Sequence, residues 1–162
     1  MSLLKTILAG LRQAKGRDSP GTRGASSRFP KRIRQLVRQM GFPACDLDEV
    51  ENSALLELPA EMDGYSLFVK ERPTGEILIM LQTRSHWQDV APAAIHRRVF
   101  CLKQAVKHCS LRVSTAADGD TCCIAETLLE NLDALSAEKL ELVLEDMAVC
   151  ILGIDTLGHV AD

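Results

Sequence analysis

Residues 52–82 read NSALLELPAEMDGYSLFVKERPTGEILIMLQ, and this stretch decides the fold. It holds three apolar runs of strand length, over residues 53–58, 65–70 and 76–82. Turn residues separate the runs: Asp63-Gly64 leads into the second, and Pro73-Thr74-Gly75 leads into the third. The stretch therefore predicts a three-strand antiparallel meander.

Both faces of the predicted meander are apolar. Because successive side chains of a strand point to opposite faces, one face carries Leu56, Leu58, Leu67, Val69, Ile77, Ile79 and Leu81. The other face carries Leu55, Phe68, Leu78 and Met80. An antiparallel sheet commonly has one solvated face. We therefore expect the domain's helices on the first face. For the second face we expect an N-terminal helix, a second subunit or a client peptide.

Apolar residues at helical spacing predict three helices around the strands. The first runs from Phe29 to a stop at Gly41, the second spans 91–108, and the third begins at the N-cap Ser136. An acidic loop is expected at 46–51. Strands at 110–116 and 121–126 are joined by Asp118-Gly119-Asp120, a hairpin signal. The predicted fold is α+β: helix, three-strand meander, helix, two-strand hairpin, helix.

Some apolar residues of these helices lie off the core stripes. Phe100 lies off the stripe of the second helix, and Leu142 and Val149 lie opposite the stripe of the last one. Acidic residues surround the latter two: Glu138, Glu141, Glu145 and Asp146. Together with the second face of the meander, these three residues are predicted to contact a partner chain. The amount of uncovered apolar surface predicts a homodimer.

The charge is unevenly distributed along the chain. Residues 1–38 hold ten Lys and Arg and one acid, whereas residues 39–162 hold nine Lys and Arg and 21 acids. The first of these segments begins with an amphipathic helix that carries Leu4, Ile7, Leu8 and Leu11, followed by a Gly- and Ser-rich linker. The expected organisation is an N-terminal helix and linker over 1–28, a domain over 29–157 and a tail over 158–162. Two interpretations of the basic arm over 1–38 remain open: it binds the acidic body, a membrane or a nucleic acid, or it is simply a solvated tail.

The sequence does not contain the motifs of a common catalytic, cofactor or metal site. There is no G-x-G-x-x-G, Walker loop, H-E-x-x-H or G-x-S-x-G. The six cysteines form no C-x-x-C, and most lie in apolar stretches, so we expect reduced thiols in a cytoplasmic protein. His86-Trp87 is interpreted as an anchored loop. His108-Cys109 is a candidate reactive pair, although adjacent side chains seldom point the same way. Cys122-Cys123 is a candidate redox pair, although the two face opposite sides of a strand and a core position explains them better. We expect no catalytic residue, metal or cofactor.

The element order resembles that of the class I type III secretion chaperones, which are small acidic dimeric chaperones of effectors, and of the YbjN-like proteins. The second half carries most of the resemblance. It rests on the helix at 91–108, Leu111-Arg112-Val113, Ala125-Glu126-Thr127-Leu128 and the segment 135–140 that leads into the last helix. It covers roughly residues 30–155, and residues 1–28 lie outside it. The resemblance implies a non-enzymatic, often dimeric module that binds a peptide or protein.

Three functions are compatible with these observations. The first is a chaperone-like or adaptor protein that binds a partner protein or peptide segment. The second is a regulatory module whose basic N-terminal arm docks to an anionic surface, either a membrane or a nucleic acid. The third is a small thiol enzyme, which modification of a single reactive cysteine would reveal.

Overall fold

The computed structural model describes residues 28–58, 65–83, 92–104, 106–115 and 121–155. The helices are α2 (Arg28–Met40), α3 (Pro92–Lys103) and α4 (Ala137–Asp155), and a short 3₁₀ turn, η3 (Leu132–Ala134), precedes α4. The strands are β1 (Cys45–Asp48), β2 (Ser53–Leu56), β3 (Tyr65–Glu71), β4 (Ile77–Thr83), β5 (Ser110–Thr115) and β6 (Thr121–Leu129). The predicted α+β class and the main order of elements are confirmed.

The six strands form a single antiparallel sheet in the order β1-β2-β3-β4-β6-β5. The predicted meander is present as β2, β3 and β4. At the β3–β4 turn, Gly75 has a φ of 88°, and its N–H donates to the Arg72 carbonyl at 2.9 Å. The predicted hairpin is present as β5 and β6, and it belongs to the same sheet as the meander, because residues 124–129 of β6 pair with residues 77–82 of β4. The whole domain is therefore built on one sheet.

Strand β1 replaces the first half of the predicted acidic loop, so that prediction was wrong for residues 46–48. Cys45-Asp46-Leu47-Asp48 pairs antiparallel with β2, with Leu47 half-buried and the two aspartates exposed. After the strand, the Asp48 carboxylate accepts hydrogen bonds from the N–H groups of Val50 and Glu51, at 2.9 and 3.0 Å. The acidic residues therefore point outward from an edge strand, where charge also discourages unwanted strand pairing.

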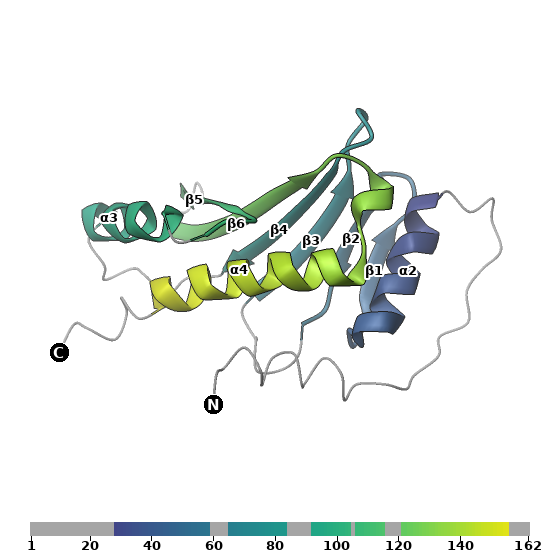
Figure 1. The fold of residues 1–162 in the computed structure, drawn as a ribbon, viewed down its shortest axis with the longest axis horizontal. Helices are drawn as coiled ribbons and strands as arrows, with labels where there is room; N and C mark the ends of the chain where they lie inside the picture. The colour runs from purple at the N-terminus through teal and green to yellow at the C-terminus, as the bar shows by residue number, and fades with distance from the viewer. Residues whose placement is uncertain (1–27, 59–64, 84–91, 105, 116–120, 156–162) are drawn as a thin grey trace.

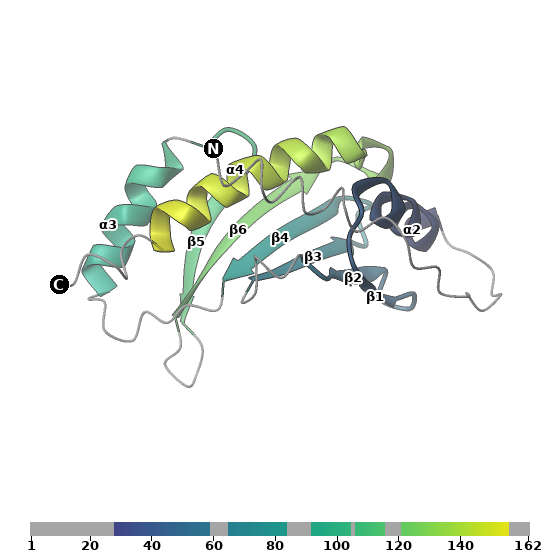
Figure 2. The ribbon, with the colours of Figure 1, turned by 90° about the horizontal axis from the view of Figure 1, so that it is seen from below.

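The three helices of the described residues pack on the same face of the sheet (Figures 1 and 2). Helix α4 runs across this face, α2 lies at the β1 end, and α3 contacts both α4 and β5. We call this the inner face. Its strand residues alternate with exposed or half-buried ones, and Leu67, Val69, Ile77, Ile79 and Leu81 are all fully buried. They join Phe29, Ile33, Leu140 and Met147 from the helices in one core.

Local hydrogen bonds explain where the helices begin and end. Gly41 ends α2 with a φ of 74°, and its N–H donates to the Val37 carbonyl at 2.9 Å, as expected for a helix C-terminus. Ser136 caps α4 as predicted, because its Oγ accepts from the Lys139 N–H at 3.1 Å. Helix α3 was predicted too long: it ends at Lys103, since the N–H groups of Lys107 and His108 donate to Asp146 instead.

Several predictions fall outside the described residues. These are the N-terminal helix and linker, the loop that holds His86-Trp87, the Asp118-Gly119-Asp120 turn and the tail at 158–162. Among the helices that the structure does describe, none combines the length and the apolar character that a membrane crossing requires.

Candidate functional site

The face of the sheet opposite the helices is the strongest candidate for a binding site. Leu55 of β2 lies directly across from Phe68 of β3, and Phe68 lies across from Met80 of β4. One row further along the strands, Leu78 of β4 lies across from Leu128 of β6. We call these five side chains the open face. They are contributed by four adjacent strands. Directly opposed side chains touch within each row, and the two rows are neighbours because Leu78 and Met80 lie two residues apart on the same face of β4.

The open face is accessible to solvent. Leu55 is 45% exposed and Leu128 is 44% exposed, while Phe68, Leu78 and Met80 are half-buried among their sheet neighbours. The adjacent Leu67, which points to the inner face, is 0% exposed. Within the part of the chain that the structure describes, no helix lies on the open face (Figure 2). An apolar area of this kind on a small domain commonly marks an interaction site.

Paired charges border the open face. Lys70 lies across from Leu78, and its Nζ is 3.1 Å from a carboxylate oxygen of Glu51. On the other side, Glu126 lies across from Met80 and binds Arg112, with 3.2 Å between Nε and Oε2. Exposed pairs of this kind contribute little to stability. They place polar groups on both sides of the apolar centre.

Sequence reasoning named four of the five open-face residues and missed Leu128. The predicted strand ended at Glu126, whereas β6 continues to Leu129. Leu129 is buried on the inner face and Leu128 is exposed on the other side, so the strand alternation persists beyond the predicted end. The apolar pair at 128–129 was the signal that would have extended the strand.

The other predicted contact residues lie elsewhere. Leu142 and Val149 are 40% and 44% exposed on α4. Helix α4 covers the inner face (Figure 2), so these two residues belong to the helix layer and are separated from the open face by the sheet. Phe100 of α3 is 65% exposed. The four predicted meander residues therefore lie together on the open face, whereas the three predicted residues of α3 and α4 are not part of it.

Some basic residues of α2 bind other parts of the domain. Arg28 binds Asp133, with 2.6 Å between Nη2 and Oδ1, and Arg32 donates from Nε to the Leu135 carbonyl at 2.7 Å. Arg34 forms an ion pair with Glu49, which follows β1. These contacts attach α2 to the segment before α4 and to the first hairpin, so part of the basic character of this helix has a structural use.

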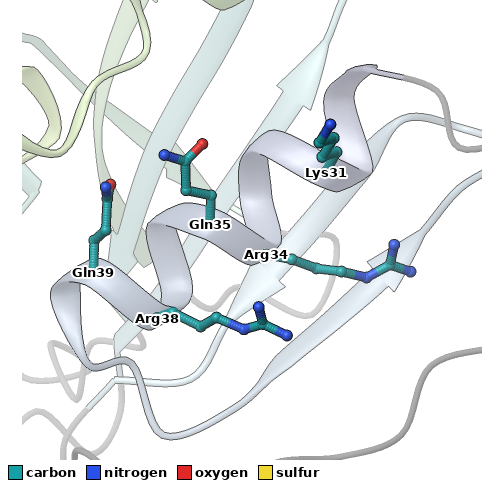
Figure 3. Close-up of a pocket in the computed structure, with 5 residues that line it drawn as sticks. All are labelled: Lys31, Arg34, Gln35, Arg38 and Gln39. Carbon is teal, nitrogen blue, oxygen red and sulfur yellow. The ribbon is translucent and has the colours of Figure 1, made fainter.

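A shallow cavity of about 480 Å³ lies along the solvent side of α2. Its lining residues are Lys31, Arg34, Gln35, Arg38 and Gln39, all from this one helix (Figure 3). Figure 3 shows Arg34 and Arg38 extending in the same direction from successive turns. The cavity is basic and open, and it offers cationic groups without an enclosed chamber.

The described residues form no grouping of three or more His, Cys, Asp and Glu side chains suited to a metal ion. Burial raises the pKa of the Cys45 thiol, the nearby Asp46 carboxylate raises it further, and Arg34 partly opposes both. Cys45 is thus protonated at neutral pH and is a poor nucleophile. His108 and Cys109 are neighbours in sequence, but the sulfur of Cys109 approaches Cys150 of α4, at 3.9 Å.

The fold described above is similar to that of a protein of known structure. YbjN from E. coli, described as a candidate transcription regulator, superposes with a TM-score of 0.55 at 13% sequence identity, over 80% of this chain and 92% of that chain. The Yersinia pestis type III secretion chaperone SycH, solved in complex with a stable fragment of YscM2, gives a TM-score of 0.49 at 11% identity, over 76% and 98%.

The comparison with YbjN confirms the predicted resemblance at the level of fold. The sequence matches no protein-family model and has no significant match among curated proteins. The likeness is therefore one of architecture, and the function has to be argued from the residues of the site itself.

Proposed function

We propose that the protein is a non-enzymatic, chaperone-like or adaptor module that binds an apolar segment of a partner protein on its open face. The observation that carries the proposal is the continuous, accessible apolar area formed by Leu55, Phe68, Leu78, Met80 and Leu128 on the side of the sheet that no described helix covers. The inner face already accommodates the core, so these five side chains are not needed to pack the helices.

The energetics favour reversible binding. Complete burial of a Leu, Met or Phe side chain stabilises by about 1.5–3 kcal/mol. The open-face residues are already partly covered, so a partner gains about 1 kcal/mol from each, or about 5 kcal/mol in all. Association itself costs several kcal/mol. Useful affinity therefore requires further contacts at the border, where Lys70 and Glu126 lie.

The proposal can be tested without knowing the partner, by selecting binders from a displayed library of random peptides. Peptides selected on the wild-type protein should be rich in apolar residues and should bind Phe68→Ser about tenfold more weakly, which corresponds to about 1.4 kcal/mol. Val50→Ser is the control, because it removes an apolar side chain that is 91% exposed in the turn between β1 and β2, outside the open face. Equal loss of binding in both variants, or selected peptides without apolar residues, would contradict the proposal.

We also propose that the protein forms a homodimer through a surface that includes Phe100. An aromatic side chain that is 65% exposed on a helix supports this, because burying it between two copies removes a large apolar area from water. The contact lies on α3, so it does not require the strands that form the open face.

The expected location of the protein is the cytoplasm, where six cysteines without a C-x-x-C pattern would stay reduced.

A second candidate function is docking to an anionic surface through residues 1–38. The observation that favours it is the alignment of Arg34 and Arg38 beside Lys31 on the solvent side of α2, in a segment with ten Lys and Arg. Phosphatidylserine vesicles and duplex DNA should be tried separately at about 50 and 200 mM salt, since contacts with phosphate weaken steeply over this range. The double variant Lys31→Glu and Arg38→Glu should lose binding, and Phe68→Ser should keep it.

A further inference from the structure

Two cysteines that are far apart in sequence meet at the corner formed by α3, α4 and β5. Cys109 lies just before β5, and Cys150 lies on α4, 41 positions further along the chain. Their sulfur atoms are 3.9 Å apart, and both are unlinked thiols. A disulfide requires an S–S distance of about 2.05 Å. The two sulfur atoms must therefore approach each other by about 1.9 Å to form it.

A second contact holds the two cysteines in place. Asp146 lies one helical turn before Cys150, and its Oδ2 accepts hydrogen bonds from the backbone N–H groups of Lys107, at 2.9 Å, and His108, at 2.6 Å. These two residues directly precede Cys109. The carboxylate therefore fixes the segment that carries Cys109 against the turn of α4 that carries Cys150, and hydrogen bonds to a charged acceptor are the stronger kind.

The two thiols have different environments. Cys109 is half-buried and within reach of a small oxidant, whereas Cys150 is 0% exposed. The hydrogen bond from Cys150 lowers the pKa of Cys109, against the opposing effects of burial and of Asp146. The same hydrogen bond and burial raise the pKa of Cys150. Cys109 is thus the nucleophile of the pair, and Cys150 is the thiol positioned to react with its oxidised form.

We propose that Cys109 and Cys150 form a reversible intramolecular disulfide when the protein meets hydrogen peroxide. The Cys109 thiolate attacks one peroxide oxygen, the O–O bond breaks, and the products are a Cys109 sulfenic acid and hydroxide. Cys150 gives its proton to this hydroxide and its sulfur attacks the Cys109 sulfur, which releases the sulfenic oxygen as a second hydroxide. That hydroxide takes up the proton that Cys109 gave up on ionising. Two thiols and one peroxide thereby yield one disulfide and two waters, and a dithiol reductant reverses the reaction.

The disulfide would join α4 covalently to the segment that connects α3 with β5. In the reduced protein this corner is held by the Asp146 hydrogen bonds and by the packing of α3 against α4 and β5. A cross-link over this span restricts the unfolded chain and also prevents α4 from separating locally from the sheet. Oxidation is therefore expected to stabilise the domain, independently of what binds the open face.

Peptide mapping tests the proposal on the full chain. Trypsin cleavage after Lys107, Arg112 and Lys139 places Cys109 in the peptide 108–112 and Cys150 in the peptide 140–162, while the other cysteines fall on different peptides. After peroxide treatment and alkylation, we expect these two peptides to be joined with the loss of two hydrogens. Dithiothreitol should separate them. The melting temperature should rise by several degrees on oxidation and return on reduction.

Three variants make the test specific. Cys101→Ser removes an exposed thiol of α3 and should leave the cross-link and the stabilisation intact. Cys109→Ser changes a half-buried position and should abolish both effects, and Cys150→Ala should do the same without placing a hydroxyl in the core. Oxidation that yields no joined 108–112 and 140–162 peptides, or that links Cys109 to a different cysteine, would overturn the proposal.

Discussion

Replacing Phe68 by Ser, with Leu67→Ser as its matched control, tests which face of the sheet is the core. The two residues are adjacent in β3 and point to opposite faces. Leu67 is 0% exposed and packs under the helices, whereas Phe68 is half-buried on the open face. Both variants thus introduce a Ser in the same strand, and they differ mainly in the burial of the side chain that is replaced.

The expected costs differ severalfold. Leu67→Ser removes a fully buried side chain, which costs about 2–5 kcal/mol, and buries a hydroxyl at a cost of about 1–3 kcal/mol more. About 5 kcal/mol is comparable with the whole stability of a small domain. Phe68→Ser removes a side chain that is only half covered and places the hydroxyl near water, so we expect a loss of about 1 kcal/mol. That loss lowers the melting temperature by about 4 °C.

The assay is a thermal melt of each variant followed by peptide binding. Leu67→Ser should be largely unfolded or should melt far below the wild type. Phe68→Ser should melt close to it, should be more soluble because it exposes less apolar surface, and should bind the selected peptides about tenfold more weakly. The reasoning is refuted if Phe68→Ser destabilises as much as Leu67→Ser, because the open face would then be an internal core surface.

Three further changes have expected outcomes. A chain that begins at Arg28 should melt within a few degrees of the full chain, because the described core starts at Phe29; a large decrease would place residues 1–27 in the core. Phe100→Glu should convert a dimer into a monomer in sedimentation at micromolar concentration, and an unchanged dimer would exclude this residue from the contact. Ser136→Ala should cost about 1 kcal/mol in a thermal or urea melt, because the N-cap of α4 is lost, and an unchanged melt would show that the cap is dispensable.

Much of the fold could be predicted because strand alternation and helix caps act locally. The alternation in residues 65–82 correctly separated the inner face from the open face, and Gly41 and Ser136 marked helix boundaries. Strand β1 was missed because Asp46 and Asp48 suggest a loop. They are tolerated in a strand because β1 lies at the edge of the sheet. Which strand lies at the edge depends on how the strands pair, and the local sequence does not show this pairing.

The remaining differences have tertiary causes. Helix α3 ends early because Asp146, more than 35 positions away in sequence, binds the backbone N–H groups that would have continued the helix. The proximity of Cys109 and Cys150 depends on the same contact. No spacing rule could have paired these two cysteines, since the sequence shows only that each lies in an apolar context. The same carboxylate thus holds the segment that follows α3 and lies one helical turn before Cys150.

The positions of the exposed apolar residues bear on how the proposed functions combine. The open face lies on one side of the sheet, and α4, with Leu142 and Val149 on its solvent side, lies on the other (Figure 2). A partner on the open face and a second partner on α4 would therefore be separated by the full thickness of the sheet and the helix layer. Contacts that share no residues are expected to contribute independently to binding. This arrangement suits an adaptor, because occupation of one surface leaves the other accessible.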